Sequence, residues 1–265
     1  MNPISAPILA YHQITPEAPP ANLSYAVSVS QFERQMRFLH EHGYACLSLA
    51  ELMRHSDNGQ PRPRRSVALT FDDGYGSFFT HAYPVLRCYG LTATVFVVTN
   101  EIHRQSDLKR GVDRLYLTWE QIEALQQGGI SFGSHTCTHS RLPDLSREEI
   151  QHELAASKEC LEVRLGQEIQ WLAYPYADST SEIRKMAEET GYEAAFGGSR
   201  GRSGRYNIRR HFCLRDATLV TFVLGLSRCH HNFEYLREDT EVGRFLRKVK
   251  HRMVPKKGSD ERSAD

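Results

Sequence analysis

The chain has 265 residues, of which 40% are hydrophobic and 25% charged, values that exclude a disordered or membrane-embedded protein and suit one large α/β domain. Lys and Arg number 33 against 32 Asp and Glu, and a net charge of +1 gives no indication of nucleic-acid binding. The six cysteines are scattered without a CxxC pair, which predicts free thiols.

The first ten residues have neither the basic region nor the apolar run of a signal peptide. No stretch approaches the ~18 apolar residues of a membrane-spanning helix. We therefore expect a cytoplasmic protein without a transmembrane segment.

Short apolar runs alternate with helical stretches along the whole chain. The expected strands are 8–11, 44–49, 66–71, 92–98, 130–133, 169–174, 193–196 and 207–214. This alternation is typical of a parallel sheet with crossover helices. It predicts a distorted (β/α) barrel of about seven or eight strands, with a doubly wound open sheet as the alternative.

Several expected helices carry local start and stop signals. Gly43 follows an apolar helical pattern and can adopt the left-handed conformation that ends a helix. Thr118 with Gln121, and Ser146 with Glu149, have the spacing of a capping box at a helix start. These signals separate the helices from the strands around them.

Two segments interrupt the alternation. Residues 197–205 are rich in glycine and arginine, which indicates a mobile loop or a contact with an anionic group. Residues 244–257 are basic, as in a solvated terminal helix or a segment that contacts an acidic membrane from its inner face. We expect one domain over residues 1–230, followed by a basic C-terminal helix and tail over 231–265.

Unusual polar groups follow four of the expected strands. They are His12, Asp72-Asp73, the segment from Ser134 to His139, and the segment from Tyr174 to Tyr176. Because parallel strands present their carboxyl ends on one side, these groups are expected to meet at one rim.

Asp72 and Asp73 are adjacent carboxylates that repel each other and leave the strand in different directions. This arrangement suits one group that binds a cation and another that performs acid-base chemistry beside it. The alternative is a helix N-cap before Gly74.

His135 and His139 are four residues apart, a spacing at which two imidazoles can bind one ion. With a carboxylate from another strand they would form a catalytic metal site that leaves positions open for water and substrate. Two surface histidines on a turn are the alternative. Cys137 between them is expected to pack rather than to bind metal.

Residues 70–75 together with 134–139 resemble the first two motifs of the polysaccharide deacetylase family, also called NodB-homology or carbohydrate esterase 4. The similarity runs from about residue 8 to 215. It implies a NodB-type barrel and a metal-dependent hydrolase that removes N-acetyl groups from an aminosugar or glycan of the N-acetylglucosamine type, releasing acetate.

The resemblance also implies roles for the residues of both motifs. Asp73, His135 and His139 would hold a divalent metal, with Zn²⁺ expected and Co²⁺, Ni²⁺ or Mn²⁺ as alternatives. Asp72 would be the general base toward the attacking water.

Tyr176 lies in a segment that resembles the third motif, in which the tyrosine backbone N–H stabilises the oxyanion. The glycine usual after this tyrosine is Ala177, and the arginine that orients the base is replaced by Ala173. The substitute is expected at the last strand, as Arg209 or Arg210, and we assign it to Arg209.

The late Leu-x-His motif that supplies the general acid in most family members is missing. Tyr11-His12 instead resembles the branch typified by deacetylases of poly-β-1,6-N-acetylglucosamine, in which an N-terminal histidine is the acid. His12 is therefore assigned this role, with His211 as the alternative.

Three other functions fit the same sequence. The protein could be a deacylase or deformylase of a lipid-linked aminosugar in exopolysaccharide biosynthesis, a glycan-binding relative without activity, or a metal-free structural protein. The intact Asp72, Asp73, His135 and His139 argue against the glycan-binding relative. A metal analysis of the purified protein would discriminate the metal-free structural protein.

Overall fold

The computed structural model describes residues 6–19, 21–102, 116–197, 204–215 and 217–226. The expected basic tail and most of the glycine- and arginine-rich segment lie outside these residues. Within them, none of the helices has both the length and the apolar character needed to cross a bilayer.

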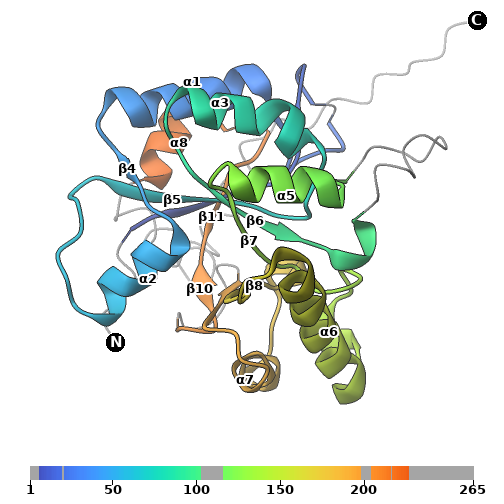
Figure 1. The fold of residues 1–265 in the computed structure, drawn as a ribbon. Coiled ribbons are helices and arrows are strands. Elements are labelled where there is room, and N and C mark those ends of the chain that lie inside the picture. Colours follow the sequence, from blue (N-terminus) through green and yellow to red (C-terminus); the bar gives the residue numbers. More distant parts are fainter. Residues whose placement is uncertain (1–5, 20, 103–115, 198–203, 216, 227–265) are drawn as a thin grey trace, which may run out of the picture.

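Eight parallel strands form one continuous sheet, bordered by helices (Figure 1). In spatial order they are β10 (Ile208–Arg209), β9 (Ala194–Gly197), β8 (Trp171–Ala173), β7 (Ser131–Ser134), β6 (Thr94–Val97), β5 (Ser66–Phe71), β1 (Ile8–Tyr11) and β11 (His211–Phe212). A further short strand, β4 (Ala45–Cys46), pairs with the first residues of β5, where β6 does not pair. β2 (Ile14–Thr15) and β3 (Val27–Ser28) form a separate pair.

The two ends of this sheet are joined by one short segment. β10 pairs with β9 at one end and β11 pairs with β1 at the other, and only Arg210 separates β10 from β11. Residues 208–212 therefore close the sheet into a nearly complete barrel. The predicted distorted barrel is confirmed, and the doubly wound open sheet is wrong because its edge strands would not meet in this way.

Helices lie between most of the strands, and the three predicted start or stop signals lie at the ends of helices. The helices are α1 (Val29–Glu41), α2 (Leu49–Asp57), α3 (Tyr83–Cys88), α5 (Trp119–Gln127), α6 (Arg147–Leu165), α7 (Ser181–Glu189) and α8 (Leu219–Gly225). Both predicted capping boxes are present, at the starts of α5 and α6. Gly43 follows α1 with a φ of 65°, as its role in ending the helix requires. In Figure 1, α3 and α8 lie next to α1, and both contact it.

Side chains alternate between the inside of the barrel and its outer, helix-covered face. An inner cluster joins alternate residues of six strands with three residues of α2. Phe96 of β6 and Phe196 of β9 belong to it, and their rings lie 5.5 Å apart although the strands are not neighbours. A Cβ on Gly133 would come within 2.6 Å of the Phe96 ring, so glycine is required for this packing. The inside of the barrel is therefore a packed core.

The cysteines within the described residues are free thiols, as predicted. They are Cys46, Cys88, Cys137, Cys160 and Cys213. Cys229 lies outside these residues.

Candidate active site

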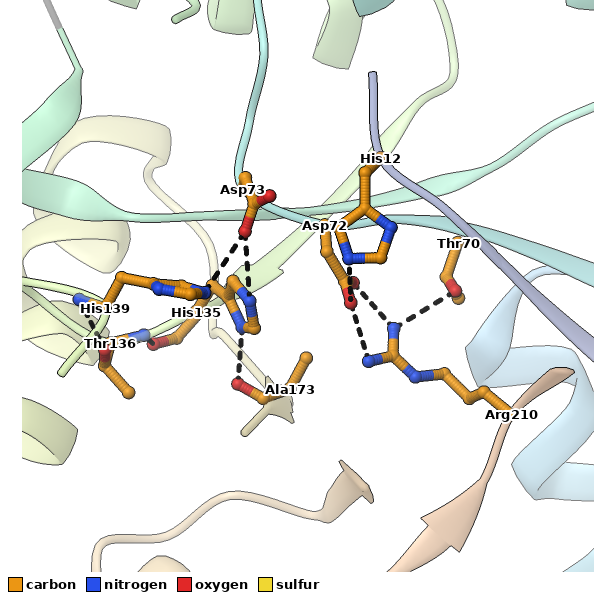
Figure 2. Close-up of polar contacts among 10 residues, drawn as sticks. His12, Thr70, Asp72, Asp73, His135, Thr136, His139, Ala173 and Arg210 are labelled. Carbon is orange, nitrogen blue, oxygen red and sulfur yellow. Dashed lines mark hydrogen bonds and ion pairs between the residues drawn. The ribbon is translucent and has the colours of Figure 1, made fainter. Parts of the chain in front are cut away.

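Three polar residues continue the inner face of the barrel beyond its apolar cluster. Ile8, Ala68 and Ile208 belong to that cluster. Ile8 precedes His12 by four positions, Ala68 precedes Asp72 by four, and Ile208 precedes Arg210 by two. Because side chains on a strand alternate with a period of two, all three polar side chains are directed to the same side. Figure 2 shows them converging on the Asp72 carboxylate.

Asp72 and Arg210 form a buried ion pair with two parallel hydrogen bonds. Arg210 Nη1 donates to Oδ1 at 2.6 Å and Nη2 to Oδ2 at 2.8 Å, with side-chain exposures of 0% for Arg210 and 3% for Asp72. Arg210 Nη1 also donates to Thr70 Oγ1. Burial alone would raise the pKa of Asp72, but the Arg210 guanidinium, together with the nearby His135 and His12, outweighs burial and holds that pKa below its usual range. Asp72 is therefore ionised and fixed in orientation at neutral pH.

The assignment of this arginine to Arg209 is wrong. Arg210 makes the contact, because Arg209 is the neighbouring residue and alternation along the strand directs it to the opposite face. The sequence left both candidates open, because the face to which each side chain of so short a strand points depends on how that strand pairs with its neighbours.

His12 lies on the other side of Asp72. Its Nε2 is 3.9 Å from Asp72 Oδ2, and its ring packs against Tyr25 at a centroid distance of 4.8 Å. Burial lowers the pKa of His12, and the Asp72 carboxylate opposes this change. The alternative acid, His211, lies elsewhere: a Cβ on Gly225 of α8 would come within 2.5 Å of its Nε2, which places His211 on the outer face. Of the two histidines considered as the general acid, His12 is therefore the one that lies beside Asp72.

The expected metal ligands converge beside this group. Asp73 Oδ1 is 3.4 Å from His135 Nε2 and 3.3 Å from His139 Nε2, and the three potential ligand atoms lie within 4.8 Å of one another. Asp73 adopts a left-handed backbone, with a φ of 70°, which turns it away from Asp72. Two imidazole nitrogens and one carboxylate oxygen form a donor set that fits Zn²⁺ or a similar divalent ion and leaves positions open.

His135 is held in one orientation by the neighbouring strand. Its Nδ1 lies 2.7 Å from the backbone oxygen of Ala173, which can only accept a hydrogen bond. Nδ1 therefore carries the proton and Nε2 is left as the ligand atom. Cys137 is buried and lies outside the ligand group found within the described residues, in agreement with its expected packing role.

Tyr176 lies at the rim of the site with 63% of its surface exposed, and its ring is 4.8 Å from that of His139. Tyr176 and Ala177 both have a left-handed backbone, with φ values of 56° and 53°. The glycine that the family motif usually has at this position would adopt such a conformation freely.

We expect Ala177→Gly to raise the free energy of unfolding by about 0.5–1 kcal/mol. Relief of the left-handed alanine, roughly 1–2 kcal/mol, outweighs the entropy that glycine adds to the unfolded chain. Urea unfolding monitored by circular dichroism would measure it. Ala187→Gly, inside α7, is the control and should lower stability by about 1 kcal/mol. Equal losses in both variants would contradict the strain at position 177.

The sequence profile of the family described as "Polysaccharide deacetylase" matches residues 59–195, which include both aspartates and both histidines. The chain belongs to the polysaccharide deacetylase family. The predicted family is thereby confirmed.

Two curated relatives illustrate how far the similarity extends. The Bacillus subtilis protein YxkH, which bears the name of a polysaccharide deacetylase, is 34% identical over 191 residues, or 72% of this chain and 63% of the relative. The poly-β-1,6-N-acetyl-D-glucosamine N-deacetylase of Escherichia coli K12 is 33% identical over 135 residues, or 48% of this chain and 20% of the relative. The chain thus spans less than two thirds of either relative.

Solved structures of deacetylases have the same fold. The Streptococcus pyogenes deacetylase PplD, determined in complex with acetate, superposes with a TM-score of 0.75 and 28% identity over 85% of this chain and all of that one. IcaB from Ammonifex degensii has a TM-score of 0.67 and 22% identity over 85% of this chain and 96% of that one, a similarity of fold alone.

Proposed function

We propose that this member of the polysaccharide deacetylase family is a metal-dependent hydrolase that removes N-acetyl groups from an N-acetylated glycan of the N-acetylglucosamine type and releases acetate. The observation that carries the proposal is the position of an ionised, arginine-bound carboxylate, Asp72, directly next to the three-ligand group. The names of the relatives support the substrate class, and the acetate complex of PplD supports the product.

The residues of the site have complementary roles in this reaction. A divalent ion held by Asp73, His135 and His139 would supply a Lewis acid for the amide carbonyl and the attacking water. Asp72 takes a proton from that water, and Arg210 keeps Asp72 ionised until it does.

The second half of the reaction breaks the amide bond. The Tyr176 backbone N–H donates to the oxyanion that forms when water adds to the carbonyl carbon. His12, on the far side of Asp72, gives a proton to the sugar nitrogen as the C–N bond breaks. The products are acetate and a free amine.

Removal of the metal tests this proposal. We expect a chelator to abolish acetate release from β-1,6-linked N-acetylglucosamine oligomers, and Zn²⁺ or Co²⁺ to restore it. Chelation should also lower the unfolding temperature, because an ion present at 100 times its dissociation constant stabilises the native state by about 2.7 kcal/mol.

Two outcomes of this assay would contradict the proposal. Acetate release that persists in chelator would exclude metal dependence. A folded, metal-loaded protein that releases no acetate from free oligomers or from lipid-linked N-acetylated aminosugars would indicate another acyl group or a binding function.

A further inference from the structure

Residues 134–139 carry the two histidines of the proposed metal site, and most backbone N–H groups of this histidine-bearing segment donate to side chains rather than to backbone carbonyls. Four successive backbone N–H groups in it each donate to a side-chain oxygen. The contacts are Thr136 N to Ser134 Oγ at 3.0 Å, Cys137 N to Glu153 Oε2 at 2.8 Å, Thr138 N to Glu153 Oε2 at 3.0 Å, and His139 N to Thr136 Oγ1 at 3.2 Å.

Of the residues that accept hydrogen bonds from these four N–H groups, only Glu153 lies outside residues 134–139. It projects from α6 and is only 6% exposed, and its Oε1 also accepts a hydrogen bond from Thr138 Oγ1 at 2.7 Å. Three donors thus converge on one buried carboxylate, which can accept all of them in its ionised form. Ser157, one turn further along α6, bonds to Ser134 Oγ at 2.8 Å and extends the same support to the end of β7.

The carbonyl side of the segment is fixed as well. The oxygens of Thr136 and Cys137 accept hydrogen bonds from the backbone N–H groups of Thr99 and Asn100, at 3.1 and 3.0 Å. Glu153 and the residues after β6 therefore hold the segment from two directions.

The backbone of the segment requires this support. Thr136 and His139 have φ values of 69° and 59°, left-handed conformations that cost roughly 1–3 kcal/mol each and persist only where the surroundings determine them. The second of these conformations sets the direction of the His139 ring toward Asp73 Oδ1.

We infer that Glu153 is a positioning residue that fixes the histidine-bearing segment in the conformation competent to bind the metal. The inference rests on the proposed function, because the ligands that it concerns are those of the proposed metal. Glu153 acts through its hydrogen bonds to the backbone of Cys137 and Thr138 and to the Thr138 hydroxyl. Residues that support metal ligands in this way commonly contribute about 10–100-fold to affinity.

Three substitutions of Glu153 separate the reach of its side chain from its charge. Glu153→Gln keeps the reach and an acceptor oxygen, Glu153→Asp keeps the charge but is one methylene too short, and Glu153→Ala removes both. Leu161→Ala is the matched control, because Leu161 is fully buried in α6 two turns beyond Glu153 and lies outside these contacts. Circular dichroism would establish the temperature range in which each variant is folded.

Cobalt titration of the full-length protein, followed by the visible absorption of bound Co²⁺, gives the first measurement. We expect the dissociation constant to rise about 10–100-fold in Glu153→Asp and Glu153→Ala, and less than threefold in Glu153→Gln. The absorption band should change shape in the first two variants only. Leu161→Ala should lower the unfolding temperature and leave the dissociation constant and spectrum unchanged.

Amide hydrogen exchange in metal-free protein gives a second measurement that does not depend on the proposed function. We expect the amides of Cys137 and Thr138 to lose protection in Glu153→Asp and to keep it in Glu153→Gln. Wild-type affinity and protection in Glu153→Asp, or a glutamine variant as impaired as the alanine variant, would overturn the inference. Wild-type protein that binds no Co²⁺ would refute the proposed metal site, while the exchange data would still decide the role of Glu153.

Discussion

Asp72→Asn is expected to slow acetate release by on the order of 10²–10⁴-fold while the metal still binds. Asparagine has the shape of aspartate but cannot take a proton from water, and the ligand oxygen belongs to Asp73. Acetate release and metal content, measured on the same purified sample, would test the prediction.

Asp73→Asn is the matched control for this experiment. It lies next to Asp72 and changes the same functional group, but it should lose metal and activity together. Because Asp72→Asn also leaves Arg210 without its counter-charge, circular dichroism must show that the variant is folded. Wild-type turnover by folded Asp72→Asn would exclude Asp72 as the general base.

Arg210→Ala is expected to lower the free energy of unfolding at pH 7 by about 3–5 kcal/mol, because it leaves the Asp72 carboxylate buried and unpaired. Arg210 contributes the largest opposition to the effect of burial, so its removal should raise the pKa of Asp72 relative to the wild type. The acidic limb of the pH–activity profile should then move to higher pH in any residual activity. Urea unfolding and the pH profile are the two measurements.

The stability difference should depend on pH in a defined direction. In the wild type the lowered pKa of Asp72 contributes stability that is present above the pKa of the unfolded chain and lost as pH falls through the folded pKa. In Arg210→Ala the pKa of Asp72 in the folded state is expected to be higher than in the wild type, so the variant loses less stability as pH falls. The difference in the free energy of unfolding should therefore shrink on acidification.

The neighbouring arginine provides the control. Arg209→Ala removes the same side chain from the opposite face of the strand, so it should leave the pH profile unchanged. A larger shift in the profile for Arg209→Ala than for Arg210→Ala would contradict the geometry of the site.

The convergence of Asp73, His135 and His139 was predictable, because parallel strands bring their carboxyl ends to one rim. The choice between Arg209 and Arg210 was not. The sequence predicts one strand over residues 207–214, whereas the chain divides at Arg210 because it must pair with β9 before it and with β1 after it. Which side chains of such a segment point into the barrel depends on pairing with strands that are distant in sequence.

Glu153 left a weaker signal. It lies on the same face of α6 as Ile150 and Leu154, so a polar residue at an inward position was visible in the sequence. Its partners are backbone groups of a segment whose left-handed residues have no sequence signature. Periodicity indicates that such a residue is buried, but only the folded structure shows what it holds.

The segment that closes the barrel also completes the surroundings of Asp72. Residues 208–212 pair with β9 on one side and with β1 on the other, and the same segment supplies Arg210, which pairs with the Asp72 carboxylate. This segment comes after all the other strands of the ring in the sequence, so Asp72 gains its arginine partner only when the ring is complete. In a chain whose barrel is not yet closed, the proposed base would lack the two hydrogen bonds that fix its orientation, so full activity is expected only from completely folded molecules.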